Sequence, residues 1–176
     1  MTDAELKSLM RERAYLEGDF VLRSGRRSRY YLDKYRFETH PDVLRELGRR
    51  MADEAERAGA SPDLLAGPEL GAVALAASAS MAAGIPFLIV RKDAKAYGTE
   101  RRIEGVYEPG ASVCLLEDVV TTGGAAVSAV KALREAGLEC RTAICVVDRD
   151  EGGADALARH AVRLHPLFRA SQIAEA

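Results

Sequence analysis

The chain has 176 residues, of which 48% are hydrophobic and 30% charged, and its 25 basic and 27 acidic side chains give a formal net charge of -2. This length predicts one domain over residues 1–176 with a substantial core, and the balanced charge argues against a dedicated nucleic-acid binder. Gly, Pro and Glu interrupt the longest low-charge stretch, residues 64–90, so no segment is expected to span a membrane. The charged N-terminus is unlike a secretory signal, and we expect a cytoplasmic protein.

Cysteine and histidine do not predict a metal centre or a nucleophile. The 3 cysteines form no C-x-x-C pair, and Cys114 and Cys145 lie in apolar runs that are typical of buried thiols. The 3 histidines are scattered without the spacing of metal ligands. We therefore expect no metal held directly by the protein.

The N-terminal part of the chain predicts a helix, two short strands and a second helix. Apolar residues recur at helical spacing over residues 3–14. Residues 20–32 carry two apolar and aromatic clusters interrupted at Gly25, which indicates two strands around a turn that could form a lid or hood. Thr39 is expected to cap a helix that begins near Pro41.

From residue 64 onward, short apolar strands alternate with helices. The strands are predicted at residues 64–66, 86–90, 113–116, 142–147 and 162–164, and the helices at residues 72–83, 125–136 and 154–160. Continuous apolar strands separated by helices indicate a parallel sheet covered on both faces. Such sheets bind ligands beyond the carboxyl ends of their strands, so we expect the site just after the first four of these strands.

The strongest functional signal is the segment of residues 113–125. An apolar strand leads to Glu117 and Asp118, then to a Thr/Gly loop that opens a helix. Loop amides and a helix N-terminus can hold an anion, and adjacent carboxylates can accept hydrogen bonds from vicinal hydroxyls, so a sugar phosphate satisfies both. No Lys follows the glycines, as a Walker A loop requires, and the acids precede them, unlike in a dinucleotide fingerprint. The alternative is an ordinary strand-to-helix turn with solvated acids.

The run E-D-V-V-T-T-G-G at residues 117–124 resembles the signature with which type I phosphoribosyltransferases bind 5-phosphoribosyl 1-pyrophosphate (PRPP). Further segments, in order, are similar to parts of the orotate phosphoribosyltransferase family. Residues 20–33 are similar to its N-terminal hood, and residues 67–71 to its pyrophosphate loop. Residues 90–98 are similar to its mobile catalytic loop, and residues 147–153 to its orotate-binding segment. The resemblance implies the type I phosphoribosyltransferase fold, an α/β fold with a mostly parallel central sheet flanked by helices and a small N-terminal hood.

The resemblance also implies a division of the chain and an activity. Residues 1–36 would form the N-terminal helix and hood, residues 37–168 the core, and residues 91–105 the mobile catalytic loop. The implied reaction transfers ribose 5-phosphate from PRPP to orotate, giving orotidine 5'-phosphate and pyrophosphate in de novo pyrimidine synthesis. The implied cofactor is Mg²⁺ carried by the substrate. The implied assembly is a homodimer in which the catalytic loop of one subunit reaches the site of its partner.

The resemblance assigns catalytic roles to Lys92, Lys95 and Asp118. The implied PRPP contacts are Glu69, Leu70, Gly71, Arg91, Lys92, Lys95, Tyr97, Glu117, Asp118, Val119, Val120, Thr121, Thr122, Gly123, Gly124 and Ala125. The implied orotate contacts are Arg23, Tyr31, Leu32, Thr121 and Arg149. For Arg101 and Arg102 the resemblance favours no role, and a solvated charge run remains the interpretation.

Two positions depart from the family pattern. Tyr97 stands where the family commonly has His; its hydroxyl can donate to a phosphate oxygen but carries no positive charge at neutral pH. Arg23 stands where some members have Lys, which keeps the charge and changes its geometry to a fork.

Two other functions remain open. One is a phosphoribosyltransferase for another base, although the hood and Arg149 favour an anionic base such as orotate. The other is a ligand-sensing regulator of the same fold that binds nucleic acid through the basic residues of 23–36. Neither a helix-turn-helix segment before residue 20 nor an aromatic-rich RNA platform is apparent, so no nucleic-acid or membrane partner is expected.

Overall fold

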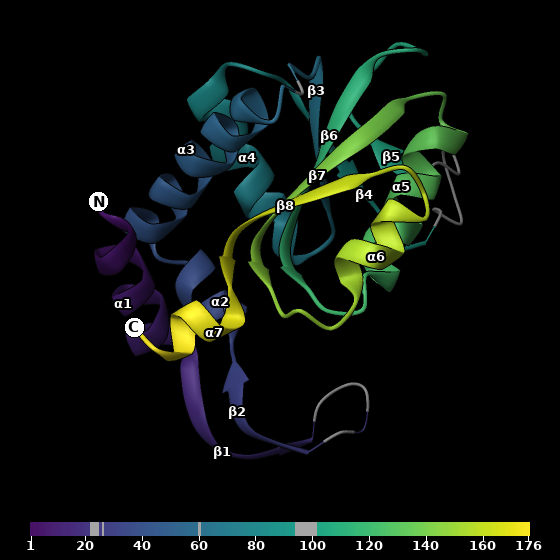
Figure 1. The fold of residues 1–176 in the computed structure, drawn as a ribbon. Helices are drawn as coiled ribbons and strands as arrows, with labels where there is room; N and C mark the ends of the chain where they lie inside the picture. Colours follow the sequence, from purple (N-terminus) through teal and green to yellow (C-terminus); the bar gives the residue numbers. More distant parts are fainter. Residues whose placement is uncertain (22–24, 26, 60, 94–101) are drawn as a thin grey trace.

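The structure is a computed structural model that describes residues 1–21, 25, 27–59, 61–93 and 102–176 (Figure 1). Within these ranges the chain forms the following helices and strands. They are α1 (Asp3–Ala14), β1 (Tyr15–Val21), β2 (Arg27–Leu32), α2 (Lys34–Glu38), α3 (Pro41–Arg57), β3 (Leu64–Pro68), α4 (Gly71–Ala83), β4 (Phe87–Val90), β5 (Ile103–Glu104), β6 (Ser112–Val120), α5 (Gly124–Glu135), β7 (Glu139–Asp148), α6 (Gly153–Ala158), β8 (Arg163–Arg169) and α7 (Ala170–Ala174). None of these helices is long and apolar enough to cross a membrane.

The central sheet has six strands in the order β5-β4-β3-β6-β7-β8. The neighbours from β4 to β8 pair in parallel, and only the short edge strand β5 pairs antiparallel, with β4. Because consecutive parallel strands need a crossover, the connections from β3 to β4, from β6 to β7 and from β7 to β8 each carry a helix. The predicted α/β class with a mostly parallel sheet flanked by helices is confirmed.

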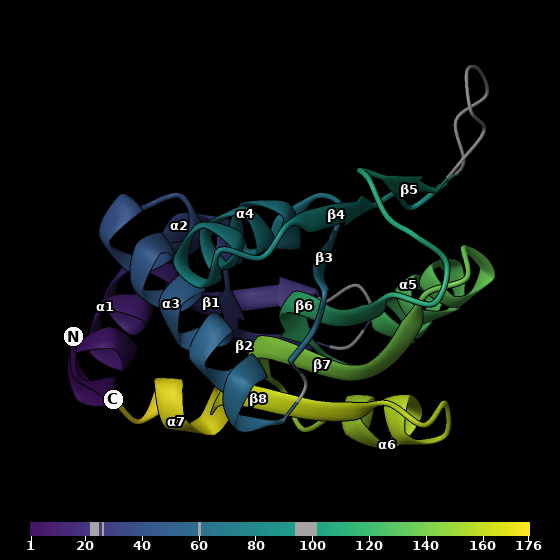
Figure 2. The ribbon, with the colours of Figure 1, turned by 90° about the horizontal axis from the view of Figure 1, so that it is seen from above.

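Helices cover both faces of this sheet (Figures 1 and 2). The side chains of β6 alternate between two cores, as a strand period of two requires. Cys114 and Leu116 pack in the core that contains α1, α3 and α4, whereas Val113 and Leu115 pack in the core that contains α5 and α6. The next two residues of β6, Glu117 and Asp118, therefore leave the strand on opposite faces.

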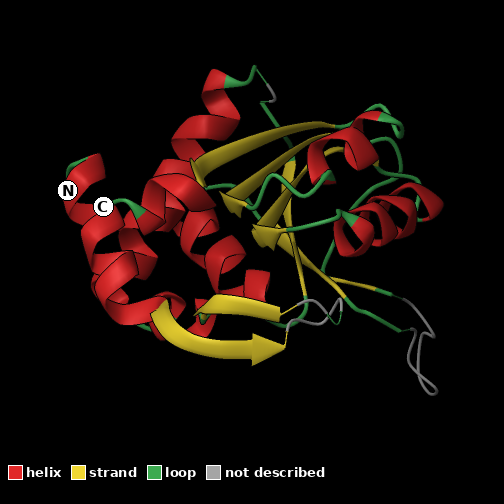
Figure 3. Ribbon diagram, turned by 60° about the horizontal axis from the view of Figure 1, so that its bottom comes forward, coloured by secondary structure: helices red, strands yellow, loops and turns green. Residues whose placement is uncertain are grey.

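A separate two-stranded sheet, formed by β1 and β2, makes the N-terminal hood (Figure 3). The two strands pair antiparallel, and the rings of Tyr15 and Tyr30 stack across them with centroids 5.2 Å apart. The hood follows α1 directly and leads through Asp33 into α2. The chain thus passes from the hood straight into the helices that cover one face of the main sheet.

Several boundaries differ from the sequence predictions. The strand predicted to end at residue 116 continues to Val120, so the two acids belong to β6 rather than to the loop after it. The prediction that Thr39 caps the second long helix is wrong, because Thr39 ends the unpredicted helix α2 and its hydroxyl donates to the carbonyl of Tyr35 at 2.7 Å. His40 precedes α3 instead, without a side-chain cap. The short elements β5 and α7 were also not predicted.

Candidate functional site

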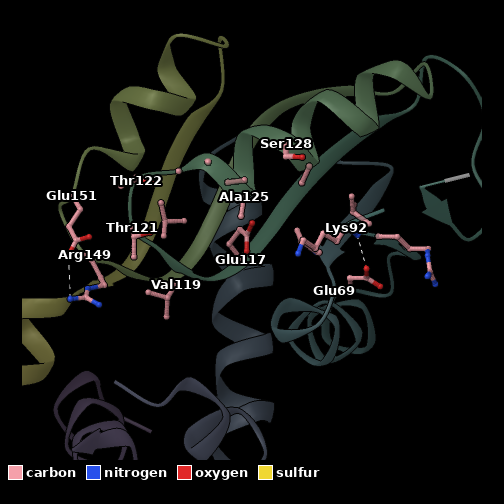
Figure 4. A pocket seen from close by; sticks show the side chains of 18 of the residues that line it. Glu69, Lys92, Glu117, Val119, Thr121, Thr122, Ala125, Ser128, Arg149 and Glu151 are labelled. Carbon is pink, nitrogen blue, oxygen red and sulfur yellow. Dashed lines mark hydrogen bonds and ion pairs between the residues drawn. The ribbon is translucent and has the colours of Figure 1, made fainter. Parts of the chain in front are cut away.

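A cavity of about 730 Å³ lies at the carboxyl ends of β3, β4, β6 and β7 (Figure 4). Many residues predicted from the sequence line it together. They are Tyr31, Glu69, Arg91, Lys92, Glu117, Val119, Val120, Thr121, Thr122, Gly123, Gly124, Ala125 and Arg149. The edge of the sheet at which a parallel α/β fold binds ligands is therefore also the edge where these side chains meet.

The loop of residues 121–123 and the start of α5 form one wall of the cavity. Gly123 has φ +81°, and a Cβ atom there would lie 3.0 Å from the backbone of Gly153 at the start of α6. Only glycine fits this close left-handed turn. Gly124, the first residue of α5, would meet no atom within 4 Å, and α5 has no side-chain cap. The first amides of α5 are therefore available to an anion in the cavity.

Glu117 lies below this wall, on the face of β6 that carries α5 (Figure 4). The residue is 6% exposed, and its Oε1 atom has no hydrogen-bond partner among the described residues. Burial, together with the charge of Asp118, raises the pKa of Glu117 to about 8. A buried, unpaired carboxyl group beside an anion-binding loop can donate to or accept from the hydroxyl groups of a ligand.

Asp118 points the other way and does not line the cavity. Its Oδ2 atom is in an ion pair with Lys34, the first residue of α2. Its Oδ1 atom accepts a hydrogen bond from the amide of Val119. A Cβ atom on Gly71 would lie 1.7 Å from Asp118 Oδ2, so the start of α4 packs directly on this carboxylate. Leu70, which is 73% exposed, and Gly71 also lie outside the cavity lining.

The opposite wall is basic and holds the base of the loop that follows β4. The amide of Arg91 donates to the carbonyl of Arg102 at 2.7 Å, which joins the two ends of this loop. The amide of Lys92 donates to Glu69 Oε1 at 2.7 Å (Figure 4), and Arg102 Nη2 donates to Ser128 Oγ at 3.2 Å. Hydrogen bonds therefore tie the ends of the basic loop to the β3–α4 connection and to α5.

The third side of the cavity lies under the hood. Arg149 follows β7 and makes an ion pair with Glu151 at 3.3 Å (Figure 4), and its guanidinium lies 5.8 Å from the ring centroid of Tyr30. The neighbouring Tyr31 lines the cavity and is 42% exposed. An arginine at the carboxyl end of β7, beside a tyrosine of the hood, can bind a planar anion.

Some predicted residues cannot be placed, and some lining residues were not predicted. Arg23, Lys95 and Tyr97 lie outside the described residues, as does the side chain of Leu32. The unpredicted lining residues are Pro68, Val90, Arg102, Ala126, Ser128, Ala129 and Glu151. Arg102 was interpreted as part of a solvated charge run. The spacing of charges alone does not reveal that Arg102 directly precedes β5, which pairs antiparallel with β4. No signal in the sequence connects Ser128 with it.

Comparison with known proteins shows the family of the chain. The model of the phosphoribosyl transferase domain family matches residues 35–162. The orotate phosphoribosyltransferase of Methanocella arvoryzae is 45% identical over 172 residues, which cover 97% of this chain and 97% of that protein. That of Halobacterium salinarum is 44% identical over 99% of this chain and 98% of its own. The chain belongs to the orotate phosphoribosyltransferase family.

Solved structures of this family are also similar over nearly the whole chain. The orotate phosphoribosyltransferase from Aeropyrum pernix has a TM-score of 0.86 and 32% identity, covering 97% of this chain and 96% of that one. The Mycobacterium tuberculosis enzyme in complex with PRPP has a TM-score of 0.82 and 31% identity, covering 97% of this chain and 98% of that one. The predictions of the type I phosphoribosyltransferase fold, of the family and of its enzyme class are confirmed.

Proposed function

We propose that the chain transfers ribose 5-phosphate from PRPP to orotate, giving orotidine 5'-phosphate and pyrophosphate, in pyrimidine synthesis. The observation that carries this proposal is the unpaired, buried Oε1 atom of Glu117 beside the uncapped start of α5, in one cavity with basic side chains. A carboxyl group suits ribose hydroxyls, an open helix N-terminus suits the 5'-phosphate, and cations suit pyrophosphate.

The sugar phosphate is proposed to lie along β6 and the loop of residues 121–125. The loop amides and the hydroxyl groups of Thr121 and Thr122 hold the 5'-phosphate. Glu117 holds the ribose hydroxyls directly, and Asp118 contributes from the opposite face of the strand. Fixing both ends of the sugar orients the anomeric carbon, and positioning of this kind supplies much of the catalysis.

The pyrophosphate is proposed to lie against the basic wall. The bond from the anomeric carbon to pyrophosphate breaks as the bond to the orotate ring nitrogen forms, so negative charge grows on the leaving group. Arg91, Lys92 and Lys95 stabilise that charge, with a hydrogen bond from Tyr97. The loop of residues 91–105 also excludes water when it covers the substrates. Leu70 and Gly71, with Glu69, complete the pyrophosphate side.

Orotate is proposed to lie under the hood, in contact with Arg149, Thr121, Tyr31, Leu32 and Arg23. Its carboxylate pairs with a guanidinium, and its ring lies on the aromatic face of the hood. Charge recognition of this kind discriminates orotate from uncharged bases. It is the feature that separates this proposal from a phosphoribosyltransferase for uracil or a purine.

Mg²⁺ is proposed to enter the site with PRPP. No group of three His, Cys, Asp or Glu side chains placed to hold a metal ion occurs in the described ranges. The substrate supplies the donors that this ion needs, because Mg²⁺ in proteins is commonly held by waters and by the phosphates of its substrate. When bound, Mg²⁺ neutralises part of the pyrophosphate charge.

The assembly is proposed to be a cytoplasmic homodimer, each subunit a single domain, in which the loop of residues 91–105 completes the partner's site. A mixture of two inactive variants tests this arrangement. Lys95→Ala removes a loop cation, and Gly123→Ala disrupts the phosphate loop, so a mixed dimer with shared sites contains one intact site. Activity should reappear on mixing and refolding the two variants. No recovery would show that one chain builds each whole site.

The proposed reaction is tested by following orotate with the wild-type protein. Orotate should be consumed only when both PRPP and Mg²⁺ are present, and pyrophosphate should form in equal amount. A panel of orotate, uracil, adenine and hypoxanthine tests the base. Turnover of a purine alone would overturn the orotate assignment while leaving the phosphoribosyl transfer intact.

A further inference from the structure

Lys34 joins the hood to the sugar-binding strand. It is the first residue of α2, reached from β2 through the single residue Asp33, and it makes an ion pair with Asp118 of β6. The side chain of Asp118 is 6% exposed and that of Lys34 is 31% exposed. Tyr31, which lines the cavity, lies on the same strand that leads into Lys34. A movement of the hood therefore shifts Lys34 and, through its ion pair, Asp118 at the end of β6.

The surroundings leave this ion pair little freedom. A Cβ atom on Gly71 would lie 1.7 Å from Asp118 Oδ2 and 2.8 Å from Lys34 Nζ, so the first residue of α4 closes over the pair. The amide of Val119 binds the second oxygen of Asp118. The N-terminus of α4 also favours a negative charge at Asp118. Asp118 is thus fixed from three sides.

Lys34 balances the charge of a cluster of buried acids. The groups that act on one another are Lys34, Asp118, Glu38 of α2 and Glu117 of β6, with smaller influences from Asp33 and Tyr35. Burial raises the pKa of Glu38 and of Glu117 to about 8, and the charge of Asp118 adds to both shifts. Burial opposes the charge on Lys34, yet Asp118 raises the pKa of Lys34 above its usual value. Lys34 is therefore the cation that faces this group of buried acids.

We propose that Lys34 is a positioning residue for the sugar site, which fixes the side chain of Asp118 behind Glu117 and couples the hood to β6. This inference rests on the proposed function, because the sugar site is part of it. Without Lys34, the buried side chain of Asp118 loses its ion pair, and a buried carboxylate without a partner is costly. Asp118 then no longer has a fixed position, and the geometry behind the ribose hydroxyls is lost.

The variant Lys34→Met tests this role, because methionine retains much of the length of the side chain and removes its charge. The KM for PRPP should rise about tenfold, the effect of losing one charge-assisted contact in the sugar site, while kcat changes less. The matched control is Arg36→Met, at an exposed position of the same helix, which should leave KM unchanged.

A double variant separates positioning from a merely structural role. If Lys34 acts through Asp118, Lys34→Met with Asp118→Asn should have the same KM for PRPP, within about twofold, as Asp118→Asn alone. This comparison stands even if Lys34→Met alone does not fold, because the double variant buries no unpaired charge.

Two results would overturn the inference: additive effects in the double variant, or a double variant that fails to fold while Asp118→Asn folds. Wild-type turnover is measured first. Its absence would contradict the proposed reaction, whereas normal wild-type turnover with an unchanged Lys34→Met variant would contradict the inference alone.

Discussion

The wall of residues 121–125 and the basic wall opposite to it are built from different parts of the chain. The first consists of backbone, glycine and small side chains on one continuous strand–loop–helix segment. The second carries the long charged side chains of Arg91, Lys92 and Arg102. The amide of Lys92 donates to Glu69 and the guanidinium of Arg102 to Ser128, both distant in the sequence. The phosphate wall is therefore formed with the fold itself, whereas the basic wall depends on individual contacts between distant segments.

This difference has consequences for substitution. A change that alters the backbone of the phosphate wall displaces several binding groups at once, so its effect on catalysis should be large. A change in the other walls removes one contact and leaves the neighbouring contacts in place, so its effect on catalysis should be smaller. The predictions below test this difference, beginning with the strongest expected effect.

Gly123→Ala should cause the largest loss. The residue has φ +81°, and the added Cβ atom would lie 3.0 Å from Gly153, so the phosphate loop must move. We expect kcat/KM to fall about 100-fold or more, and the melting temperature to fall by several degrees because a left-handed alanine costs ~1–2 kcal/mol. Steady-state kinetics and thermal denaturation measure the two effects.

The matched control for this variant is Gly124→Ala. A Cβ atom at this position would meet no atom within 4 Å, and alanine is favourable in a helix. The melting temperature should be unchanged, and only the KM for PRPP should rise, by up to about tenfold. Equal losses for the two variants would remove the distinction between a backbone-built wall and an ordinary turn.

Arg149→Ala should cause the next largest loss of activity, and the effect should be confined to the binding of orotate. Loss of a charge-assisted hydrogen bond to the orotate carboxylate corresponds to a rise of about 10- to 100-fold in the KM for orotate. The KM for PRPP should stay near that of the wild type, because Arg149 lies on the hood side of the cavity, beside Tyr30. Arg149→Lys keeps the charge and should recover part of the loss. Similar changes in both KM values would show that the base and sugar sites are not separate.

Glu69→Ala should have a smaller effect, on the basic wall. Glu69 Oε1 accepts the amide of Lys92 at 2.7 Å, which fixes the start of the basic loop. Removing this acceptor should lower kcat about tenfold, the value of one hydrogen bond of ~1.4 kcal/mol, with little change in the KM for orotate. Glu69→Gln retains an acceptor oxygen and should lie within about threefold of the wild type. A Gln variant as impaired as the Ala variant would indicate that charge at this position, and not the contact, is what matters.

The same two walls differ in how far the sequence alone predicts them. The phosphate wall is a continuous segment, so the motif at residues 117–124 names almost all of its residues. The basic wall brings Arg102 and Ser128 together from separate elements, and no local pattern encodes that contact. The strand alternation that sends Glu117 and Asp118 to opposite faces could have been predicted from the period of two, had the strand not been ended at residue 116.

The helix α2 shows a second limit. It has only five residues, too few for a periodic pattern, and Lys34 in it appears in the sequence as one more basic residue near the hood. Its pairing with Asp118 spans 84 positions of the chain. Contacts of this kind are decided by how the helices pack on the sheet, and local sequence carries no information about them.

The smallest predicted effect concerns stability and arises from Glu38, which is 2% exposed and has an Oε1 atom without a hydrogen-bond partner within the described part of the chain. Because burial raises the pKa of Glu38 to about 8, the folded protein keeps a proton that the unfolded chain releases near pH 4.5. The folded state then binds more protons between these values, so stability falls as the pH rises from about 4.5 to about 8 and is level above that. Glu117 follows the same course, since its pKa is also raised to about 8.

Glu38→Gln removes one of the two carboxyl groups that cause this pH dependence of stability. The melting temperature of the variant, relative to the wild type, should therefore rise between pH 5 and pH 8.5 by a few degrees. Part of the pH dependence should remain, because Glu117 is unchanged. Arg36→Gln, at an exposed position two residues earlier, serves as the control. The difference between its melting temperature and that of the wild type should stay constant across this pH range. A difference in melting temperature that is constant across this range would mean that Glu38 is ionised in the folded protein, and that Lys34 neutralises two carboxylates and not one.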